Sequence, residues 1–460
     1  MKKTLRKRIL VLALMLPVLL SLPRVAVLAA AAPSLVATSA LLAEEDTGKT
    51  LYALNPDARM YPASMTKIVT ALVVMDYLKL DDIVTIGDEI DATPAGSSLA
   101  RHQKGERITV MNLLRGLIMR SGNDSGCILA MDAAKKASGN GDISYPQAEK
   151  YFSGLMNDKA KALGATGTNF TNPHGFHDPN HYTTASDMFL FSREFMKNPI
   201  LAGIARETEY KGNSLGTGTA ADYTFLTQDY DWVTINELLI PGANYYQFAT
   251  GLKTGSTDEA GDCLTSSAEK GGIRLISVVF HSTVDGRYAD SIALLNYGFD
   301  NFRNETVQTS GEVVDTLEID NPMLGAATEM DTLTNSGFTG FYSRDELAAM
   351  VRKVEYGKNA VKDGKIVPPV EKGDVIGTVT YTLNGKAEFT GDVIAGDSAG
   401  ARSLNTDVTY YKDRFISNIF SLSALPYWIC AVLAVIIVII LLSSRRRKRD
   451  RSYYRLNRRY

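Results

Sequence analysis

The chain has 460 residues, of which 45% are hydrophobic and 22% are charged, a globular composition that excludes a wholly disordered, collagen-like or low-complexity protein. The net charge of −2 hides a segregation of charge, because residues 1–32 carry +6 and residues 444–460 carry +8, which leaves −16 on residues 33–443. This acidic main body argues against nucleic acid as a partner, since phosphate binding needs a basic surface.

The first 32 residues have the three parts of a secretory signal peptide. Met1–Arg8 is basic, Ile9–Leu22 is apolar, and Ala29–Ala32 supplies small residues for cleavage. Prolines and an arginine interrupt the apolar run, which makes it short for a membrane-spanning helix. We therefore expect residues 1–32 to be a signal peptide, with an uncleaved anchor as the alternative.

Residues 33–303 are expected to form one unit with strands at both ends and helices in the middle. Alternating apolar residues around tight turns indicate hairpins, and apolar residues at i, i+4 and i+7 indicate helices. The expected fold class is α+β, an antiparallel sheet with helices packed around it. Hairpins are expected at Ser34–Asn55 and Cys263–His281, and helices at Ile68–Met75, Asn112–Met119, Cys127–Ala134 and Ser291–Phe302.

The pattern changes over residues 304–412, which are expected to form a small all-β domain. Val375–Leu383 alternates strictly, with valine, tyrosine and leucine on one face and threonines on the other, and Asn384 and Gly385 then favour a tight turn. The segment contains no His or Cys and no catalytic constellation. Its expected role is that of a spacer, and a docking role stays open.

A C-terminal transmembrane helix is expected over residues 424–443. Ala424–Leu442 has no charged residue, and its 19 residues extend roughly 28 Å as a helix, close to the hydrocarbon thickness of a bilayer. Tyr427 and Trp428 suit the membrane interface, and the basic run Arg445–Arg449 follows at once. The positive-inside rule places residues 444–460 in the cytosol and residues 33–420 outside. A buried core helix is the alternative, and it fits the basic tail poorly.

Ser64, Met65, Thr66 and Lys67 open the first strong helix. A serine at this position commonly caps the helix, but Lys67 lies one turn further on the same face. A neutral amine there could take the hydroxyl proton and make Ser64 a nucleophile, while the helix N-terminus stabilises negative charge. The same spacing recurs at Ser267 and Lys270, where we expect no function.

Two further short motifs hold polar side chains. Ser121, Gly122 and Asn123 fall between two apolar helices that would hold them rigidly, whereas the similar Ser138-Gly-Asn lies in a polar, glycine-rich stretch that reads as a surface loop. Lys253-Thr254-Gly255 begins the second predicted hairpin region. It could simply be an exposed edge strand, but a cation beside a threonine hydroxyl suits a carboxylate, and glycine lets a substrate backbone approach.

The order Ser-x-x-Lys, Ser-x-Asn, Lys-Thr-Gly matches the motif set of penicillin-binding proteins and class A β-lactamases. Pro62–Lys67, Ser121–Asp124 and Gly251–Gly255 resemble the serine D-alanyl-D-alanine carboxypeptidases, the low-molecular-mass penicillin-binding proteins. The resemblance covers roughly residues 34–302 and continues more weakly into the β domain. It implies a β-lactamase/transpeptidase-like fold for residues 33–303.

The resemblance implies catalytic roles for three residues. Ser64 would attack the peptide carbonyl between two D-alanines, Lys67 would be its general base, and Ser121 would relay a proton toward the leaving amine. No deacylation glutamate of the class A β-lactamase type can be identified, which favours a carboxypeptidase in which Lys67 also activates water.

The resemblance also implies a set of substrate-binding residues. Asn123 would position the substrate amide, Lys253 would sustain the electrostatics of the site, and Thr254 and Gly255 would receive the terminal carboxylate and backbone. The backbone N–H groups of Ser64 and Ser256 would form the oxyanion hole. Arg287 matches, more loosely, an arginine near the carboxylate. Some members carry His where this chain has Ser256.

The expected substrates are peptidoglycan stem pentapeptides, with β-lactams as covalent inhibitors and with no cofactor and no metal. Removal of the terminal D-alanine would limit cross-linking. Two alternatives remain, a β-lactamase and a non-catalytic penicillin-sensing or wall-binding protein. A third, a metal-dependent peptidase, would use His174, His177 and His181, although strong turn signals indicate a structured loop there. The three cysteines are too far apart for a disulfide framework or a zinc finger.

Overall fold

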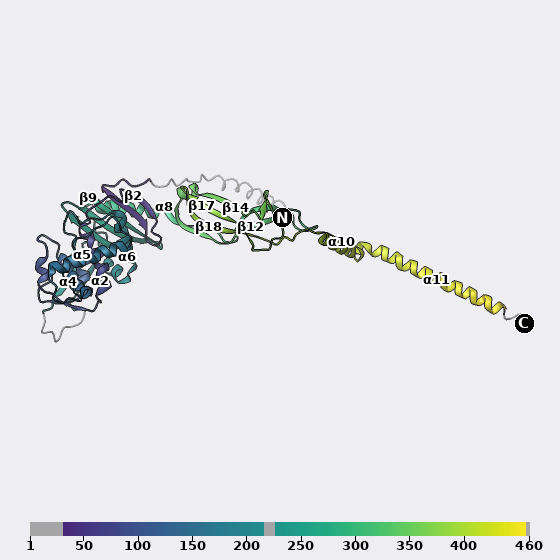
Figure 1. Ribbon diagram of the computed structural model, residues 1–460, viewed down its shortest axis with the longest axis horizontal. Coiled ribbons are helices and arrows are strands. Elements are labelled where there is room, and N and C mark those ends of the chain that lie inside the picture. The colour runs from purple at the N-terminus through teal and green to yellow at the C-terminus, as the bar shows by residue number, and fades with distance from the viewer. Residues whose placement is uncertain (1–30, 216–225, 457–460) are drawn as a thin grey trace, which may run out of the picture. The chain divides into compact units, whose positions relative to one another are not determined.

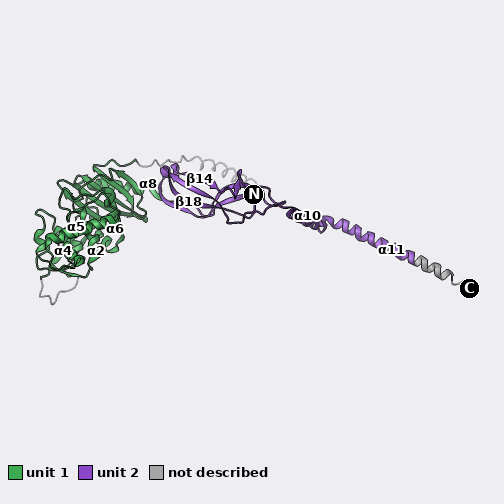
Figure 2. Cartoon of the chain, in the orientation of Figure 1, with its two compact units in different colours: residues 1–303 green, residues 304–460 purple. Residues whose placement is uncertain are grey.

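The structure, a computed structural model, describes residues 31–215 and 226–456. The chain divides into two compact units, residues 1–303 and residues 304–460 (Figure 2). From the sequence, one unit was expected over residues 33–303 and a small β domain over residues 304–412. The signal peptide expected over residues 1–32 falls almost entirely outside the described residues.

The first unit is built on a five-stranded antiparallel sheet (Figure 1). The two predicted hairpins meet in it, because the first strand of one pairs with the last strand of the other. One further strand precedes the second hairpin along the chain, pairs with its first strand and forms an edge of the sheet. In sheet order the strands are β2 (Thr50–Leu54), β1 (Ser39–Glu44), β9 (Ile273–Ser282), β8 (Gly261–Lys270) and β7 (Ala249–Thr257).

Helices pack around this sheet, which confirms the predicted α+β class. Short two-stranded sheets connect some of them. The helices are η1 (Ala63–Thr66), α2 (Lys67–Tyr77), η2 (Asp88–Ala92), α3 (Val110–Met119), α4 (Asn123–Ser138), α5 (Tyr145–Ala162), α6 (Ala185–Lys197), α7 (Pro199–Arg206) and α8 (Gly286–Asn301). The small sheets pair β3 (Ile83–Thr85) with β4 (Arg107–Thr109) and β5 (Glu209–Asn213) with β6 (Asp229–Val233).

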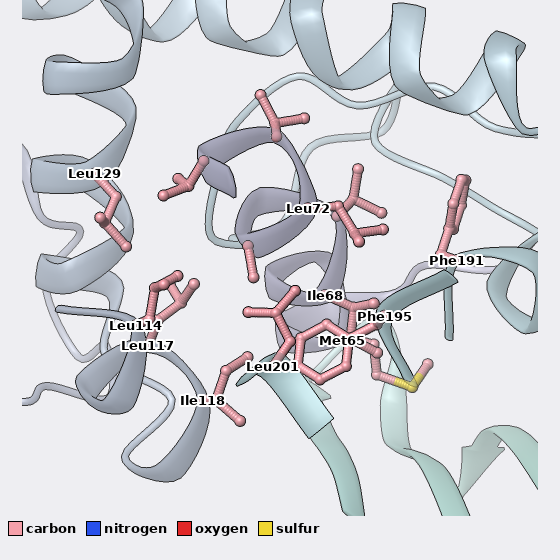
Figure 3. Packing of buried hydrophobic residues seen from close by; sticks show 14 of the residues in the cluster. Met65, Ile68, Leu72, Leu114, Leu117, Ile118, Leu129, Phe191, Phe195 and Leu201 are labelled. Carbon is pink, nitrogen blue, oxygen red and sulfur yellow. The ribbon is translucent and has the colours of Figure 1, made fainter. Parts of the chain in front are cut away.

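Helix α2 lies at the centre of the first unit's core. Every residue from Lys67 to Val74 is buried, so the helix has no solvent-exposed face over its first two turns. Figure 3 shows Met65, Ile68 and Leu72 among side chains from several other helices. These neighbours are Leu114, Leu117 and Ile118 of α3, Leu129 of α4, Phe191 and Phe195 of α6, and Leu201 of α7. The N-terminus of α2 is therefore held rigidly, since close-packed cores resist displacement.

The second unit contains a seven-stranded sheet and a two-stranded one. The strand predicted at Val375–Leu383 is β17, and Asn384 and Gly385 form its turn with φ angles of +51° and +79°. In sheet order the strands are β14 (Val351–Tyr356), β17, β18 (Lys386–Ala395), β12 (Glu329–Thr334), β11 (Val313–Ile319), β16 (Lys365–Ile366) and β15 (Val361–Lys362), and β10 (Phe302–Gln308) pairs with β13 (Phe338–Ser343).

Helices also occur in this unit, and two of them begin inside residues 304–412, the segment expected to be all-β. Besides the short α9 (Arg344–Ala349), α10 (Leu404–Ile419) starts before residue 412. Ser403 caps α10 by accepting from the N–H of Thr406, and apolar residues recur along it at helical spacing. After η3 (Leu422–Ala424), the long helix α11 (Leu425–Leu456) follows, and the segment Leu422–Arg446 is long and apolar enough to cross a membrane.

Candidate active site

Ser64 lies in η1, which runs directly into α2. Ala63, the residue before it, has a φ of +46°, in the left-handed region that non-glycine residues rarely adopt. Ser64 is half-buried, and Lys67 is fully buried one turn further on. The Nζ atom of Lys67 lies 2.8 Å from the Oγ atom of Ser64. The spacing of the Ser-x-x-Lys motif therefore brings amine and hydroxyl into hydrogen-bond contact.

The Lys67 amine makes two further contacts that orient it. Nζ donates to Oδ1 of Asn123 at 2.7 Å and to the backbone carbonyl of His174 at 2.8 Å. Both are carbonyl oxygens, which can only accept a hydrogen bond. The orientation of the Asn123 side-chain amide is supported by its other contact, in which Nδ2 donates to Oγ of Ser97. A neutral amine has two N–H groups, and these two oxygens take them both. Its lone pair is then left for the proton of Ser64.

The environment of Lys67 favours the neutral amine. Burial lowers the pKa of Lys67 to about 7, against the smaller raising effect of the Asp124 carboxylate. The neutral amine is therefore accessible at neutral pH, as a general base needs. Lys67 alone can therefore account for deprotonation of the Ser64 hydroxyl.

Ser121 and Asn123 lie where α3 ends and α4 begins, as the sequence predicted. Ser121 is buried and has a φ of +56°, and Asn123 is the first residue of α4. The backbone N–H of Asn123 donates to the carbonyl of Ser98 at 2.8 Å, which fixes the start of the helix. Ser138 of the similar tripeptide lies at the other end of α4, so the structure separates it from Lys67.

The Lys253-Thr254-Gly255 motif lies on β7, at the edge of the sheet, and packs against the nucleophile turn. A Cβ atom on Gly255 would lie 2.8 Å from the carbonyl oxygen of Pro62, so the missing side chain permits this approach. Lys253 is buried, and its Nζ donates to the carbonyl of Thr254 at 2.9 Å. Burial, and after it the charge of Lys67, hold the pKa of Lys253 well below its usual range.

Ser256 lies near the C-terminal end of β7, and Arg287 lies on α8. Ser256 is exposed and pairs across the sheet with Asp262 of β8. Arg287 of α8 makes a partly buried ion pair with Asp262, with 3.0 Å between Nη1 and Oδ1. The arginine is therefore held by a carboxylate that the sequence analysis did not single out. Ser267, by contrast, is buried within β8 and accepts a hydrogen bond from Thr250.

The three clustered histidines have separate partners. His181 contacts Thr66, His174 lies 3.8 Å from Glu149, and the ring of His177 packs edge-on against Tyr61. Within residues 31–215 and 226–456, no group of three His, Cys, Asp or Glu side chains is placed to hold a metal ion. The turn-rich loop predicted from the sequence is present, and it lies against the nucleophile helix through Lys67 and His174.

Some residues that complete the site were not predicted. Ser97 accepts from Asn123, and His174 contributes its backbone carbonyl rather than its ring. The Asp124 carboxylate accepts from the backbone N–H groups of residues 100–102, which ties that segment to α4. Only Asp124 had a local signal, its place directly after the Ser-x-Asn motif.

Comparison with known proteins agrees with this arrangement. A family model described as D-alanyl-D-alanine carboxypeptidase matches residues 26–283. The chain is 32% identical over 357 residues to the D-alanyl-D-alanine carboxypeptidase DacF of Bacillus subtilis, covering 76% of this chain and 82% of that protein. It is also 32% identical to DacC of Escherichia coli, a D-alanyl-D-alanine carboxypeptidase, with 77% and 82% covered.

Solved structures give the same result. The D-alanyl-D-alanine carboxypeptidase DacD from Francisella tularensis matches with a TM-score of 0.58 at 25% identity, covering 81% of this chain and 95% of that one. Penicillin binding protein 5 from Haemophilus influenzae matches with a TM-score of 0.55 at 27% identity, covering 81% of this chain and all of that one. Each match covers a larger share of this chain than the first unit occupies.

Proposed function

The chain belongs to the D-alanyl-D-alanine carboxypeptidase family of serine peptidases, and we propose that Ser64, Lys67 and Ser121 are its catalytic residues. The proposed substrate is the D-Ala-D-Ala end of a peptidoglycan stem pentapeptide, from which the terminal D-alanine is removed. The observation that carries the proposal is the contact of a buried Lys67, whose pKa burial lowers to about 7, with Ser64 and Asn123.

In the proposed acylation step, Lys67 takes the proton of Ser64 as Oγ forms a bond to the carbonyl carbon of the penultimate D-alanine. The carbonyl oxygen becomes an oxyanion that accepts from the backbone N–H groups of Ser64 and Ser256. The C–N bond then breaks, and the leaving amine takes a proton relayed from Lys67 through Ser121. D-alanine departs, and an ester on Ser64 remains.

In the proposed deacylation step, neutral Lys67 takes a proton from water, whose oxygen attacks the ester carbonyl. The same two N–H groups receive the oxyanion, and the proton returns to Ser64 as its C–O bond breaks. During acylation, before D-alanine leaves, Asn123 and Thr254 hold the substrate amide and the terminal carboxylate, and Arg287 and the protonated form of Lys253 favour that carboxylate. β-Lactams enter as acylating analogues of the same substrate.

Release of D-alanine from a D-Ala-D-Ala pentapeptide by the purified full chain tests this proposal. We expect turnover with the peptide and, with a penicillin, a long-lived acyl-enzyme. Hydrolysis of a chromogenic cephalosporin tests the alternative that the protein is a β-lactamase. Fast hydrolysis of the cephalosporin without D-alanine release would instead identify a β-lactamase, and stoichiometric binding with no turnover of either compound would indicate a sensor.

We propose that α11 anchors the protein with a single membrane span, the catalytic unit outside and the basic tail in the cytosol. The apolar segment Leu422–Arg446 is long enough to span a bilayer, and Arg445–Arg449 gives the charge bias that sets orientation. The expected result is that protease added to intact spheroplasts degrades the catalytic unit while a C-terminal epitope tag stays protected. Protection of the catalytic unit together with loss of the tag would show that the protein has the opposite orientation.

A further inference from the structure

The loop of residues 171–181 contacts the nucleophile turn through a chain of hydrogen bonds. The N–H of Thr171 donates to Nδ1 of His181 at 3.1 Å, so the ring proton of a neutral His181 lies on Nε2. Nε2 donates to Oγ1 of Thr66 at 2.8 Å, and Thr66 in turn donates to the carbonyl oxygen of Ala63 at 2.7 Å. Thr66 and His181 are both almost wholly buried.

The same carbonyl is confined from a second side. Gly175 has a φ of +82°, and a Cβ atom built on it would lie 1.8 Å from the oxygen of Ala63, so the loop backbone lies directly against that oxygen. Ala63 itself holds the left-handed φ of +46°. A non-glycine residue keeps such a conformation only where its surroundings enforce it, and such outliers occur preferentially at functional sites.

The position of this carbonyl decides the direction of one N–H group in the proposed site. The C=O of Ala63 and the N–H of Ser64 belong to one planar trans peptide group, so they point in opposite directions. Thr66 and Gly175 hold the carbonyl on the side of the 171–181 loop. The N–H of Ser64, a proposed oxyanion donor, is thereby directed away from that loop.

We propose that Thr66 and His181 are positioning residues that align the oxyanion hole by fixing the Ala63–Ser64 peptide plane. This inference rests on the proposed function, because it assumes that the N–H of Ser64 receives the oxyanion. The hydrogen bond from His181 to Thr66 should not change with pH, since burial lowers the pKa of His181 to about 3 and the ring stays neutral through the working pH range. Neither side chain need touch the substrate.

The test compares three threonine variants in the full chain. Thr66→Val removes the hydroxyl and keeps the volume, whereas Thr66→Ser keeps the hydroxyl. Thr70→Val is the matched control, because Thr70 is equally buried on α2 and also bonds the loop, through the carbonyl of Pro173, without touching Ala63. We expect Thr66→Val to lower kcat for D-alanine release by about 10- to 100-fold with KM nearly unchanged, and both other variants to stay near wild type.

A peptidyl boronic acid, which forms a tetrahedral adduct on a serine nucleophile, supplies a readout that a merely structural role would not move. Its affinity should fall in parallel with kcat in Thr66→Val, because it uses the oxyanion hole as the transition state does. His181→Asn interrupts the chain from the loop side and should behave similarly, and it replaces Thr66→Val if that variant does not fold.

Three outcomes would overturn the assignment. They are a Thr66→Val enzyme with wild-type kcat, a Thr70→Val enzyme that loses as much activity as Thr66→Val, and boronic acid affinity that does not change. Failure of the proposed function is a separate result, since it would show in the wild-type chain as absence of D-alanine release.

Discussion

Ser64→Ala should lower D-alanine release by at least about 10⁴-fold and abolish covalent labelling by penicillin, because it removes the atom that forms the acyl-enzyme. Ser64 is half-buried and makes its contact through Oγ, so alanine should leave the fold intact. Release of D-alanine by a coupled oxidase assay measures the first effect, and intact-mass spectrometry after exposure to penicillin measures the second.

Ser267→Ala is the matched control for this variant. Ser267 begins a second Ser-x-x-Lys sequence, but it lies within β8 and bonds to Thr250. It should keep labelling at the wild-type stoichiometry. A penicilloyl adduct on Ser64→Ala, or loss of labelling in Ser267→Ala alone, would place the nucleophile elsewhere.

Lys67→Met should lower the second-order rate of acylation by penicillin by about 10³- to 10⁴-fold, the range expected for loss of a general base. Methionine fits a buried position that already excludes water, and it cannot accept a proton. Stopped-flow measurement with a fluorescent penicillin gives the rate. A rate within tenfold of wild type would show that another group deprotonates Ser64.

The pH dependence of the same rate tests the charge state of Lys67. Its pKa lies at about 7, and only the neutral amine accepts a proton, so the wild-type rate should rise as the pH increases through 7 and level off above it. The residual rate of Lys67→Met should lack this step. A wild-type rate that falls as the pH rises through 7 would contradict a general-base role.

Short sequence motifs predicted those contacts of the site that form between residues close together in the chain. Ser64 and Lys67 meet because they are one helical turn apart, and Ser121 and Asn123 share one helix boundary. The strand Val375–Leu383 was predicted with these bounds, since strict alternation marks its course and the Asn-Gly turn marks its C-terminal end. Convergence of the three motifs followed from the family resemblance and not from any spacing.

Contacts between distant segments account for what the sequence left out. The carbonyl of His174 is 107 residues from Lys67, and a backbone acceptor has no side-chain signature. The three nearby histidines were weighed as metal ligands only as an alternative to a turn-rich loop. In the structure His181 bonds to Thr66, and Gly175 lies against the carbonyl oxygen of Ala63, whose φ is left-handed. Helix α10 was missed because its apolar residues follow a β-rich segment directly.

The central claim is that Ser64 is the residue acylated in a site formed by the segments 64–67, 121–123 and 253–255. Peptide mapping of the wild-type chain after brief exposure to penicillin tests it most directly. The account predicts one penicilloyl group per chain, carried by the peptide that contains Ser64. An adduct on Ser121 or on any other residue, with Ser64 unmodified, would contradict it.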